Sequence, residues 1–140
     1  MSNERKNKIT RENYVDEAEN VIKALSEKDK LMSTSKLRNI LSLVSDLKTD
    51  AQHSREDELN NDLKSRVQYL KMRIAYEVGR DPERKPKKNR KGKIELFVEN
   101  AGLQEIIEDI RGKRDNLLLF CDYMEALTAY HKFYYAGDEN

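Results

Sequence analysis

The segment DNLLLFCDYMEALTAYHKFYY, residues Asp115–Tyr135, decides the fold of this chain. Its apolar residues fall on almost every side of a helical wheel. The few polar positions form a narrow strip of Asp122, Glu125, Thr128, His131 and Lys132. A helix that is hydrophobic nearly all round is stable only when neighbouring helices cover it. We therefore expect a nearly fully buried C-terminal helix at the centre of a helical bundle.

The composition of the whole chain also favours helices. The chain has 140 residues, which suits one domain, and it contains only five Gly and two Pro. So few helix-breaking residues argue against a many-turned β fold. A charged fraction of 38% beside a hydrophobic fraction of 37% is typical of helices with thin apolar stripes and wide polar faces. The sequence therefore predicts an all-α, single-domain bundle of about five to six helices.

Helical periodicity and capping residues place the other helices. Thr10 can cap the first helix, and Ser54 with Asp57 forms a capping box that opens the third. The apolar phase changes at Gly102, which predicts a break between two short helices. Four of the helices before the C-terminal one are expected over residues 11–28, 54–78, 93–100 and 103–111. A further helix is expected after hydroxyl caps at 33–35, with an apolar face that runs over 37–51.

The chain is expected to have one helical body between two tails. Residues 1–10 predict a mobile basic tail, residues 11–135 the bundle domain, and residues 136–140 a second tail. Within the bundle, the Pro- and Lys-rich segment 81–92 predicts a flexible basic loop that buries nothing.

The lone Cys121 suits a small core residue. No apolar stretch approaches the ~20 residues that a membrane span needs, so we expect a cytoplasmic protein.

One flank of the third predicted helix interleaves guanidinium groups with aromatic rings. Spacings of three and four residues place Arg66, Tyr69, Arg73, Tyr76 and Arg80 in one row beside the apolar face. Arg can bond a phosphate bidentately and Tyr can stack on a base, so nucleic acid would use both residue types. A structural explanation stays open, because exposed Arg is often only solvated. For both Tyr we expect packing at the edge of the core to be the main role.

Charge is distributed unevenly along the chain although the formal net charge is only +1. Residues 31–93 carry 16 Lys or Arg against 9 Asp or Glu, whereas residues 94–140 carry 4 against 10. One surface is therefore expected to be basic and another acidic. Such a molecule can bind a polyanion on one side and a basic protein on the other.

The residue pattern predicts no catalytic, metal or cofactor site. His53 and His131 lie on different helices without a Cys or carboxylate at metal-ligand spacing. Asp122 and Glu125 are one helical turn apart and could form an acid–base pair. A structural role is favoured for them, because no partner histidine or metal ligand is near them in sequence. We therefore expect a protein that is not an enzyme.

Three segments resemble the small subunit of type III-A CRISPR (Csm) effector complexes. FCDYMEALTAYHKFY at residues 120–134 is similar to the C-terminal signature of that family, TSKLRNILSL at 34–43 to its second helix, and residues 69–80 to its third. The chain departs from the family at Asp122, where a basic residue is frequent, at 135–137, which replace a terminal Gly-Gly, and at 81–91, which resembles an insertion.

The resemblance implies a noncatalytic RNA-binding subunit of an antiviral CRISPR complex. In that family several copies stack head to tail along the crRNA and target RNA, opposite RAMP-type backbone subunits. Other subunits, among them a large polymerase-like one, perform the chemistry. The implied partners are therefore the backbones of both RNAs, these Csm subunits and copies of the chain itself, without a membrane or a cofactor. A protein that must accept any guide is expected to contact phosphates and riboses rather than base edges.

Seven basic residues are candidates for contacts to the RNA. They are Lys36, Arg38, Arg66, Lys71, Arg73, Arg80 and Lys132. For Lys132, a salt bridge to Glu125 or plain solvent exposure is an equal alternative. The alternative for the whole protein is a helical adaptor or oligomerisation module that binds only proteins, because the charge asymmetry fits both functions.

Overall fold

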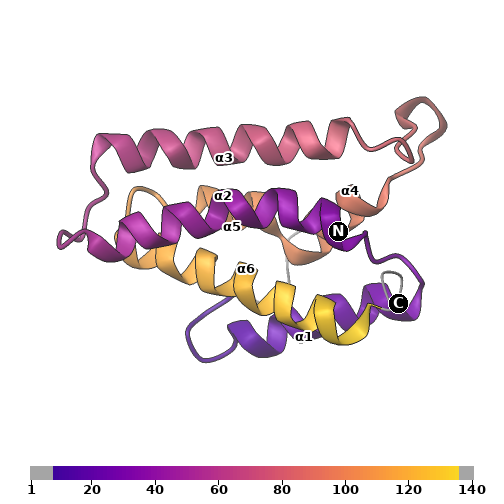
Figure 1. The fold of residues 1–140 in the computed structure, drawn as a ribbon, viewed down its shortest axis with the longest axis horizontal. Coiled ribbons are helices and arrows are strands. Elements are labelled where there is room, and N and C mark those ends of the chain that lie inside the picture. The colour runs from indigo at the N-terminus through magenta and orange to yellow at the C-terminus, as the bar shows by residue number, and fades with distance from the viewer. Residues whose placement is uncertain (1–7, 136–140) are drawn as a thin grey trace.

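The computed structural model describes residues 8–135, and within them the chain is helical (Figure 1). The described residues form no strand and contain only two isolated β-bridges. These findings confirm the predicted all-α, single-domain fold. The expected tail residues 1–7 and 136–140 lie outside the described part. In chain order the elements are α1 (Tyr14–Glu27), α2 (Thr34–His53), α3 (Asn61–Gly79), the 3-10 turn η1 (Pro86–Lys88), α4 (Lys93–Ala101), α5 (Leu103–Glu108) and α6 (Arg114–Tyr134).

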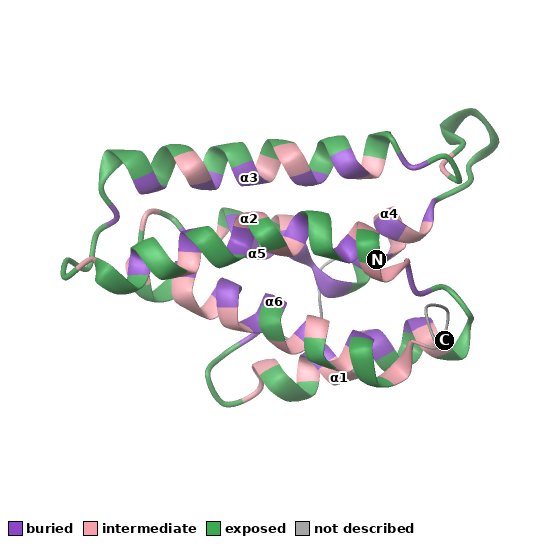
Figure 2. Cartoon of the chain, in the orientation of Figure 1, coloured by how far each residue is buried: buried purple, intermediate pink, exposed green. Residues whose placement is uncertain are grey.

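The helices lie in three layers (Figure 1). α3 runs alone along one edge, α2 lies beside it with α4 and α5, and α6 and α1 form the opposite edge. α6 packs most closely on α1 and α2, whereas α3 packs on α2, α4 and α5. No described helix covers the outer side of α3, and exposed residues run along that side (Figure 2).

α6 connects the layers, but it is less buried than the sequence predicted. The Tyr123 hydroxyl donates to the Ala101 carbonyl at 2.9 Å, and a ring nitrogen of His131 lies 2.8 Å from the Met32 carbonyl. The expected near-complete burial was wrong because α1, α2 and α5 leave one flank open, where Phe133 is 74% exposed. The buried residues of α6 are Leu117, Phe120, Cys121, Tyr123, Met124, Leu127 and His131.

α3 begins later than predicted because the residues before it pair with the segment that precedes α6. The Leu59 N–H donates to the Gly112 carbonyl at 2.8 Å, which keeps this stretch extended. The capping box expected at Ser54 and Asp57 was therefore wrong, and Ser54 instead ends α2. The N-cap of α3 is Asn60, whose side-chain oxygen accepts a backbone N–H at 2.8 Å.

The other boundaries agree with the sequence to within a few residues. α1 begins at Tyr14, and the Thr10 hydroxyl accepts a backbone N–H in the turn before it. The predicted break at Gly102 is confirmed, because this residue has a φ of 68° in the left-handed region that glycine adopts without strain. α5 ends at Glu108, before the expected residue 111.

Ile9, which the sequence assigned to a tail, is buried against the core.

The basic segment 81–92 is more structured than the flexible loop that the sequence predicted. Asp81 is 3% exposed, and its carboxylate oxygens accept from the Ile94 N–H at 3.3 Å and the Glu83 N–H at 3.1 Å. Lys36 Nζ lies 3.4 Å from the same carboxylate. Asp81 therefore ties the end of α3 to the first turns of α2 and α4.

Hydrogen bonds keep Asp81 ionised despite its burial. Burial alone would raise the pKa of Asp81, but the two backbone N–H groups and the Lys36 ammonium outweigh this effect and hold the pKa below its ordinary value of 3.8. A carboxylate with a lowered native pKa stabilises the fold above its unfolded pKa, and this contribution disappears as the pH falls through the native value. Gly92 leaves room for the carboxylate, since a Cβ at that position would lie 2.3 Å from an oxygen of Asp81.

Replacing Asp81 with Asn should lower the free energy of unfolding by about 1–3 kcal/mol, because an amide NH₂ would face donors that now meet a carboxylate oxygen. Urea unfolding followed by circular dichroism measures the loss. The variant should also lose less stability than the unmodified chain when the pH is lowered below about 4, because it lacks the titrating group. Glu83→Gln removes a charge from an exposed neighbour and should change the stability by less than about 0.5 kcal/mol. Equal effects of the two substitutions would contradict the anchoring role of Asp81.

Replacing residues 83–91 with a short Gly-Ser linker should leave the six α-helices intact, because Asp81, Gly92 and Ile94 remain. The replaced segment makes one exposed and one partly buried ion pair with α4, which together contribute little to stability. We expect the far-ultraviolet circular dichroism signal to be retained and the free energy of unfolding to fall by no more than about 1 kcal/mol. Loss of the helical signal would mean that this segment supports the core.

Candidate nucleic-acid interface

The outer side of α3 exposes two phenol rings and a thioether. Tyr69, Met72 and Tyr76 are 48%, 57% and 53% exposed, whereas Leu70 and Ile74 on the inner side are buried. The expectation that both Tyr pack at the edge of the core was wrong, because α3 forms an outer layer that no other described helix covers (Figure 1). Both rings are therefore open to a ligand.

Arg73 and Arg80 share one buried carboxylate. Glu77 is 2% exposed, and its two oxygens lie 2.8 Å from Arg73 Nη2 and 3.1 Å from Arg80 Nε. A buried carboxylate is tolerated only when it is paired, so Glu77 holds the ends of both guanidinium groups in place. The spacing of four and three residues along one helix makes this arrangement possible.

Tyr76 lies beneath the same two guanidinium groups. The Cζ atoms of Arg73 and Arg80 are 5.1 Å and 5.7 Å from its ring centroid, within the range of cation–π attraction. Arg73 Nε is buried and has no hydrogen-bond partner among the described residues. Two guanidinium groups and one carboxylate leave a net positive charge beside an exposed ring. This arrangement can bind a phosphate and stack on a base.

Two further candidates on α3 are held by carboxylates of the same molecule. Arg66 Nη1 lies 2.6 Å from Asp50 and 3.5 Å from Asp62. Lys71 Nζ lies 3.4 Å from Glu108, on the flank of α3 that faces α5. The five-residue stripe is therefore not one uniform surface. Its C-terminal half forms a cluster, and its first Arg pairs with α2.

The remaining three candidates differ in their surroundings. Lys36 faces the buried Asp81, so its charge is largely neutralised within the fold. Arg38 and Lys132 are exposed and make no ion pair with any residue in 8–135. Among residues 8–135 the alternative salt bridge between Lys132 and Glu125 is not formed, and Glu125 pairs with Lys48 instead.

Sequence reasoning missed four cations in the turn around η1. Their side chains are exposed and form no ion pair within the described part of the chain. The signal was present as a dense run of basic residues, but the two prolines in it suggested a linker. The structure places this turn directly beyond the C-terminal end of α3 (Figure 1). The four cations are Lys85, Lys87, Lys88 and Arg90.

The two acids of α6 act as structural ion-pair partners. Asp122 lies 2.5 Å from Arg11 and 2.9 Å from Lys48, which also contacts Glu125 at 2.9 Å. Lys48 donates hydrogen bonds to the carboxylates of Asp122 and Glu125, and these bonds raise the pKa of Lys48 above its ordinary range. Burial works against ionisation of Asp122, but bonds from Arg11 and Lys48 outweigh it and lower the pKa of this carboxyl. A group held ionised in this way is unsuited to proton transfer near neutral pH. Burial also raises the pKa of the Cys121 thiol to about 12.

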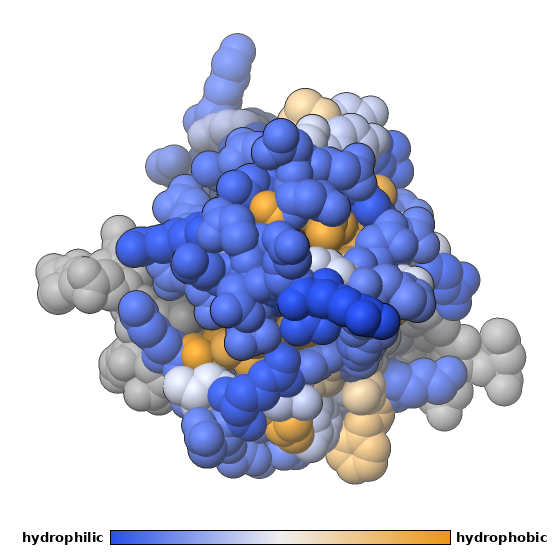
Figure 3. Space-filling view, turned by 90° about the vertical axis from the view of Figure 1, so that its left-hand side faces the viewer, coloured by the Kyte–Doolittle hydropathy of each residue, from blue (hydrophilic) through white to orange (hydrophobic). Residues whose placement is uncertain are grey.

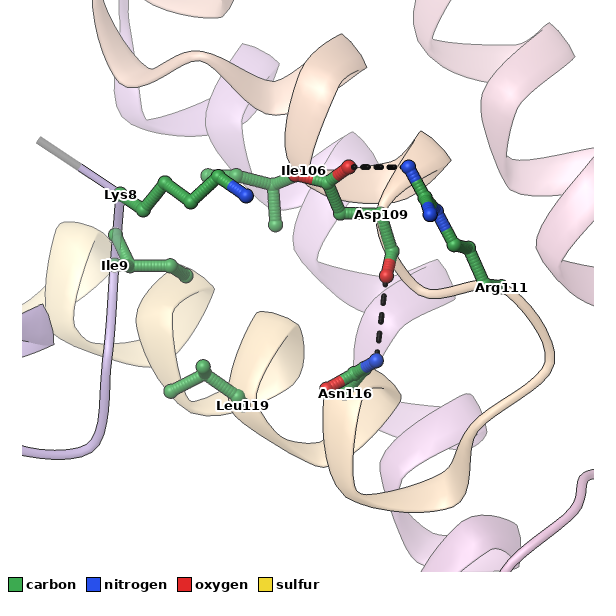
Figure 4. Close-up of a pocket in the computed structure, with 7 residues that line it drawn as sticks. All are labelled: Lys8, Ile9, Ile106, Asp109, Arg111, Asn116 and Leu119. Atoms are coloured by element: carbon green, nitrogen blue, oxygen red, sulfur yellow. Dashed lines mark hydrogen bonds and ion pairs between the residues drawn. The ribbon is translucent and has the colours of Figure 1, made fainter. Parts of the chain in front are cut away.

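An open pocket near the start of the described chain brings together no reactive groups (Figure 4). Its volume is about 350 Å³, and Asp109 at its rim lies 3.7 Å from Arg111. The side-chain amide of Asn116 donates to the Asp109 backbone carbonyl at 3.3 Å.

Within residues 8–135, no group of three or more His, Cys, Asp or Glu side chains could hold a metal ion. None of the helices in that range combines the length and apolarity that a bilayer crossing requires.

Comparison with known proteins gives consistent matches over most of the chain. A family model described as Csm2 Type III-A matches residues 8–137. The chain is 40% identical over 127 residues to the CRISPR system Cms protein Csm2 of Mycobacterium tuberculosis (strain CDC 1551 / Oshkosh), which covers 89% of this chain and 94% of that protein. It is 38% identical over 133 residues to the protein of the same description from Streptococcus thermophilus, with coverages of 93% and 98%. A relative from Enterococcus italicus is 33% identical over 109 residues, which is 76% of this chain and 71% of the relative.

The family-model match extends through every described helix, including the α3 and α6 segments on which the resemblance was based. Because the family model covers nearly the whole described chain and these relatives align over most of their own lengths, the chain belongs to the Csm2 family of type III-A CRISPR systems.

Proposed function

We propose that this chain is a noncatalytic, RNA-binding small subunit that holds the RNA backbone without sequence specificity. Several copies would stack along the crRNA and target RNA of a type III-A complex. Membership of the Csm2 family supports assignment to a Csm complex. The observation that carries the RNA-binding role is the exposed cluster of Arg73, Arg80 and Tyr76 around the buried Glu77.

The cluster suits a phosphate because its charges are already ordered. Glu77 uses Nη2 of Arg73 and Nε of Arg80, so Nη1 of Arg73 and the two terminal nitrogens of Arg80 can donate to phosphate oxygens. Charge-assisted bonds to phosphate and a ring that can stack on any base do not depend on sequence. This independence is required of a subunit that accepts every guide. Binding by such contacts releases counterions and is therefore weakened by salt.

The other candidates divide into contact residues and structural residues. Arg38 and Lys132 carry charges without an ion-pair partner in the described part and are proposed to contact RNA as well. Arg66, Lys71 and Lys36 could reach RNA only by exchanging a carboxylate for a phosphate. That exchange is easy for the exposed pairs of Arg66 and Lys71, because such pairs contribute little stability. Lys36 is least suited to it, since the carboxylate of Asp81 would be left buried.

The proposed protein partners are other Csm subunits, namely the RAMP-type backbone subunit and the large polymerase-like subunit, and further copies of the chain. One end of the molecule, viewed in Figure 3, is mostly hydrophilic with small separate apolar spots. A surface of this kind supports polar contacts between copies rather than a large apolar interface. No cofactor is needed for this function, and a cytoplasmic location is proposed with it.

A protein-only adaptor is the second candidate function, and the exposed Met72 favours it. Met and Tyr are enriched at the centres of protein interfaces, and Met72 lies between Tyr69 and Tyr76 on the outer side of α3. The two functions predict opposite effects of a positive charge at residue 72. Such a charge would attract RNA, but it would disrupt an apolar contact with a protein.

Arg73→Ala and Arg80→Ala should each weaken binding to single-stranded RNA by a similar factor for all sequences. Each should lower the slope of log affinity against log salt concentration by about 0.7 units, the contribution of one phosphate contact to a single strand. Filter binding of the full chain to random-sequence RNA across a salt series measures both effects. Arg80→Lys should keep the slope, because the charge is retained.

Arg55→Ala is the matched control, since Arg55 is exposed in the connection between α2 and α3 and makes no ion pair in residues 8–135. Its salt slope should match that of the unmodified chain. Urea unfolding of Arg73→Ala shows whether the fold survives partial loss of the partners of Glu77. Unchanged affinity at low salt in both α3 variants, with the fold intact, would remove this cluster from the binding site.

Met72→Lys separates the two candidate functions. If the outer side of α3 binds RNA, the added charge should leave RNA affinity unchanged or increase it. If this side binds only proteins, a buried lysine at the contact should prevent co-purification with the other Csm subunits. Affinity capture of the assembled complex and filter binding, performed on the same variant, measure both outcomes. Val15→Lys, at an exposed apolar residue of α1, is the control for adding a charge.

A further inference from the structure

We propose that the turn of residues 85–90 is a second, preformed site for the phosphate backbone of single-stranded RNA, separate from the α3 cluster. This inference rests on the proposed function and assigns a role to the segment that the sequence analysis treated as a linker. It depends on three features of the turn: its internal hydrogen bonds, its attachment to α4, and the four cations that remain without ion-pair partners.

Internal hydrogen bonds give the turn one defined shape. The Lys85 N–H donates to the Arg90 carbonyl at 2.8 Å, and the Arg90 N–H donates to the Lys85 carbonyl at 2.9 Å. Pro86 fixes the first position of η1, and Asn89 closes the turn at a φ of 54°. A closed turn with Pro and a left-handed Asn loses less conformational entropy on binding than a free linker would.

Salt bridges attach both sides of the turn to α4. Arg84 Nε lies 3.0 Å from Glu95, and Lys91 Nζ lies 2.7 Å from Glu99. On the α3 side, the buried Asp81 fixes the start of the segment. These contacts use the cations on either side of the turn and leave its four inner cations without an ion pair to the carboxylates of α4.

The four inner cations are concentrated and uncompensated. Lys85, Lys87, Lys88 and Arg90 lie within six residues, their side chains are exposed, and none makes an ion pair in the described part of the chain. Like charges held this close repel one another, so the arrangement is stabilised by an anion that approaches all four. The phosphates of a nucleic acid strand supply several negative charges along one path.

RNA fits this turn better than an acidic protein does. The only side chains of residues 85–90 are those of the four cations, Pro86 and Asn89, so the turn offers no aromatic or large aliphatic anchor for a protein interface. The turn also follows Arg80 by only a few residues and lies beyond the end of α3 (Figure 1). A strand that binds the α3 cluster can therefore continue onto the turn.

The test compares two triple variants of the full chain that remove equal charge. Lys85, Lys87 and Lys88 are changed to Gln in one, and Lys23, Lys28 and Lys30, which are exposed and unpaired in residues 8–135, are changed to Gln in the other. Binding to random-sequence single-stranded RNA is measured by filter retention across a salt series. Three phosphate contacts contribute about two units to the salt slope for a single strand, so the turn variant should lose about that amount. The control variant should keep its slope.

A photocrosslinking amino acid at position 87 identifies the partner in the assembled complex. The expected product is a crosslink that ribonuclease treatment shortens. A crosslink only to protein, or a turn variant with the same salt slope as the control variant, overturns the inference. If Arg80→Ala weakens binding while the turn variant does not, the proposed function stands and this site fails. If neither variant differs from its control, or if the chain binds no RNA at low salt, both proposals fail.

Discussion

The buried carboxylate of Asp81 determines where the basic surface of this protein lies. It accepts hydrogen bonds from the segment after α3 and from the first turn of α4, and it pairs with Lys36 at the start of α2. The ends of three helices therefore meet at one ionised group. If this carboxylate were lost, the backbone N–H groups that donate to it would have no acceptor. Because of this anchor, the basic turn and the C-terminal half of α3 form one end of the molecule. Gly92 permits the arrangement by leaving the space that a side chain would fill.

A second buried acid, Glu77, has a related effect on the candidate interface. Desolvation makes an unpaired carboxylate costly, so Glu77 keeps Arg73 and Arg80 beside it and above the ring of Tyr76. The acid reduces the local charge but orders the donors. Ordered donors favour binding, because flexible arginine side chains would otherwise lose rotamer freedom when they bind a phosphate.

The charge asymmetry along the chain has a different meaning in three dimensions. The sequence suggested one basic and one acidic surface, but many of the opposite charges meet within the molecule. Lys48 pairs with Asp122 and Glu125, and Arg84 with Glu95. Acids of the C-terminal third thus neutralise bases of the middle third across helix interfaces. The cations that remain without ion-pair partners in the described chain therefore define the candidate interface more sharply than the total of basic residues does.

The sequence by itself determined the helical class, the positions of α2 and α4, the break at Gly102 and the family resemblance. These features depend on periodicity, capping and local motifs, which act over a few residues. It did not determine the start of α3, where pairing between Leu59 and Gly112 replaced the expected cap. Only the tertiary structure decided which candidates are exposed, because ion pairs and burial join residues far apart in sequence. Lys36 and Asp81, 45 positions apart, illustrate the reason: no local pattern reveals that a lysine will meet a buried carboxylate.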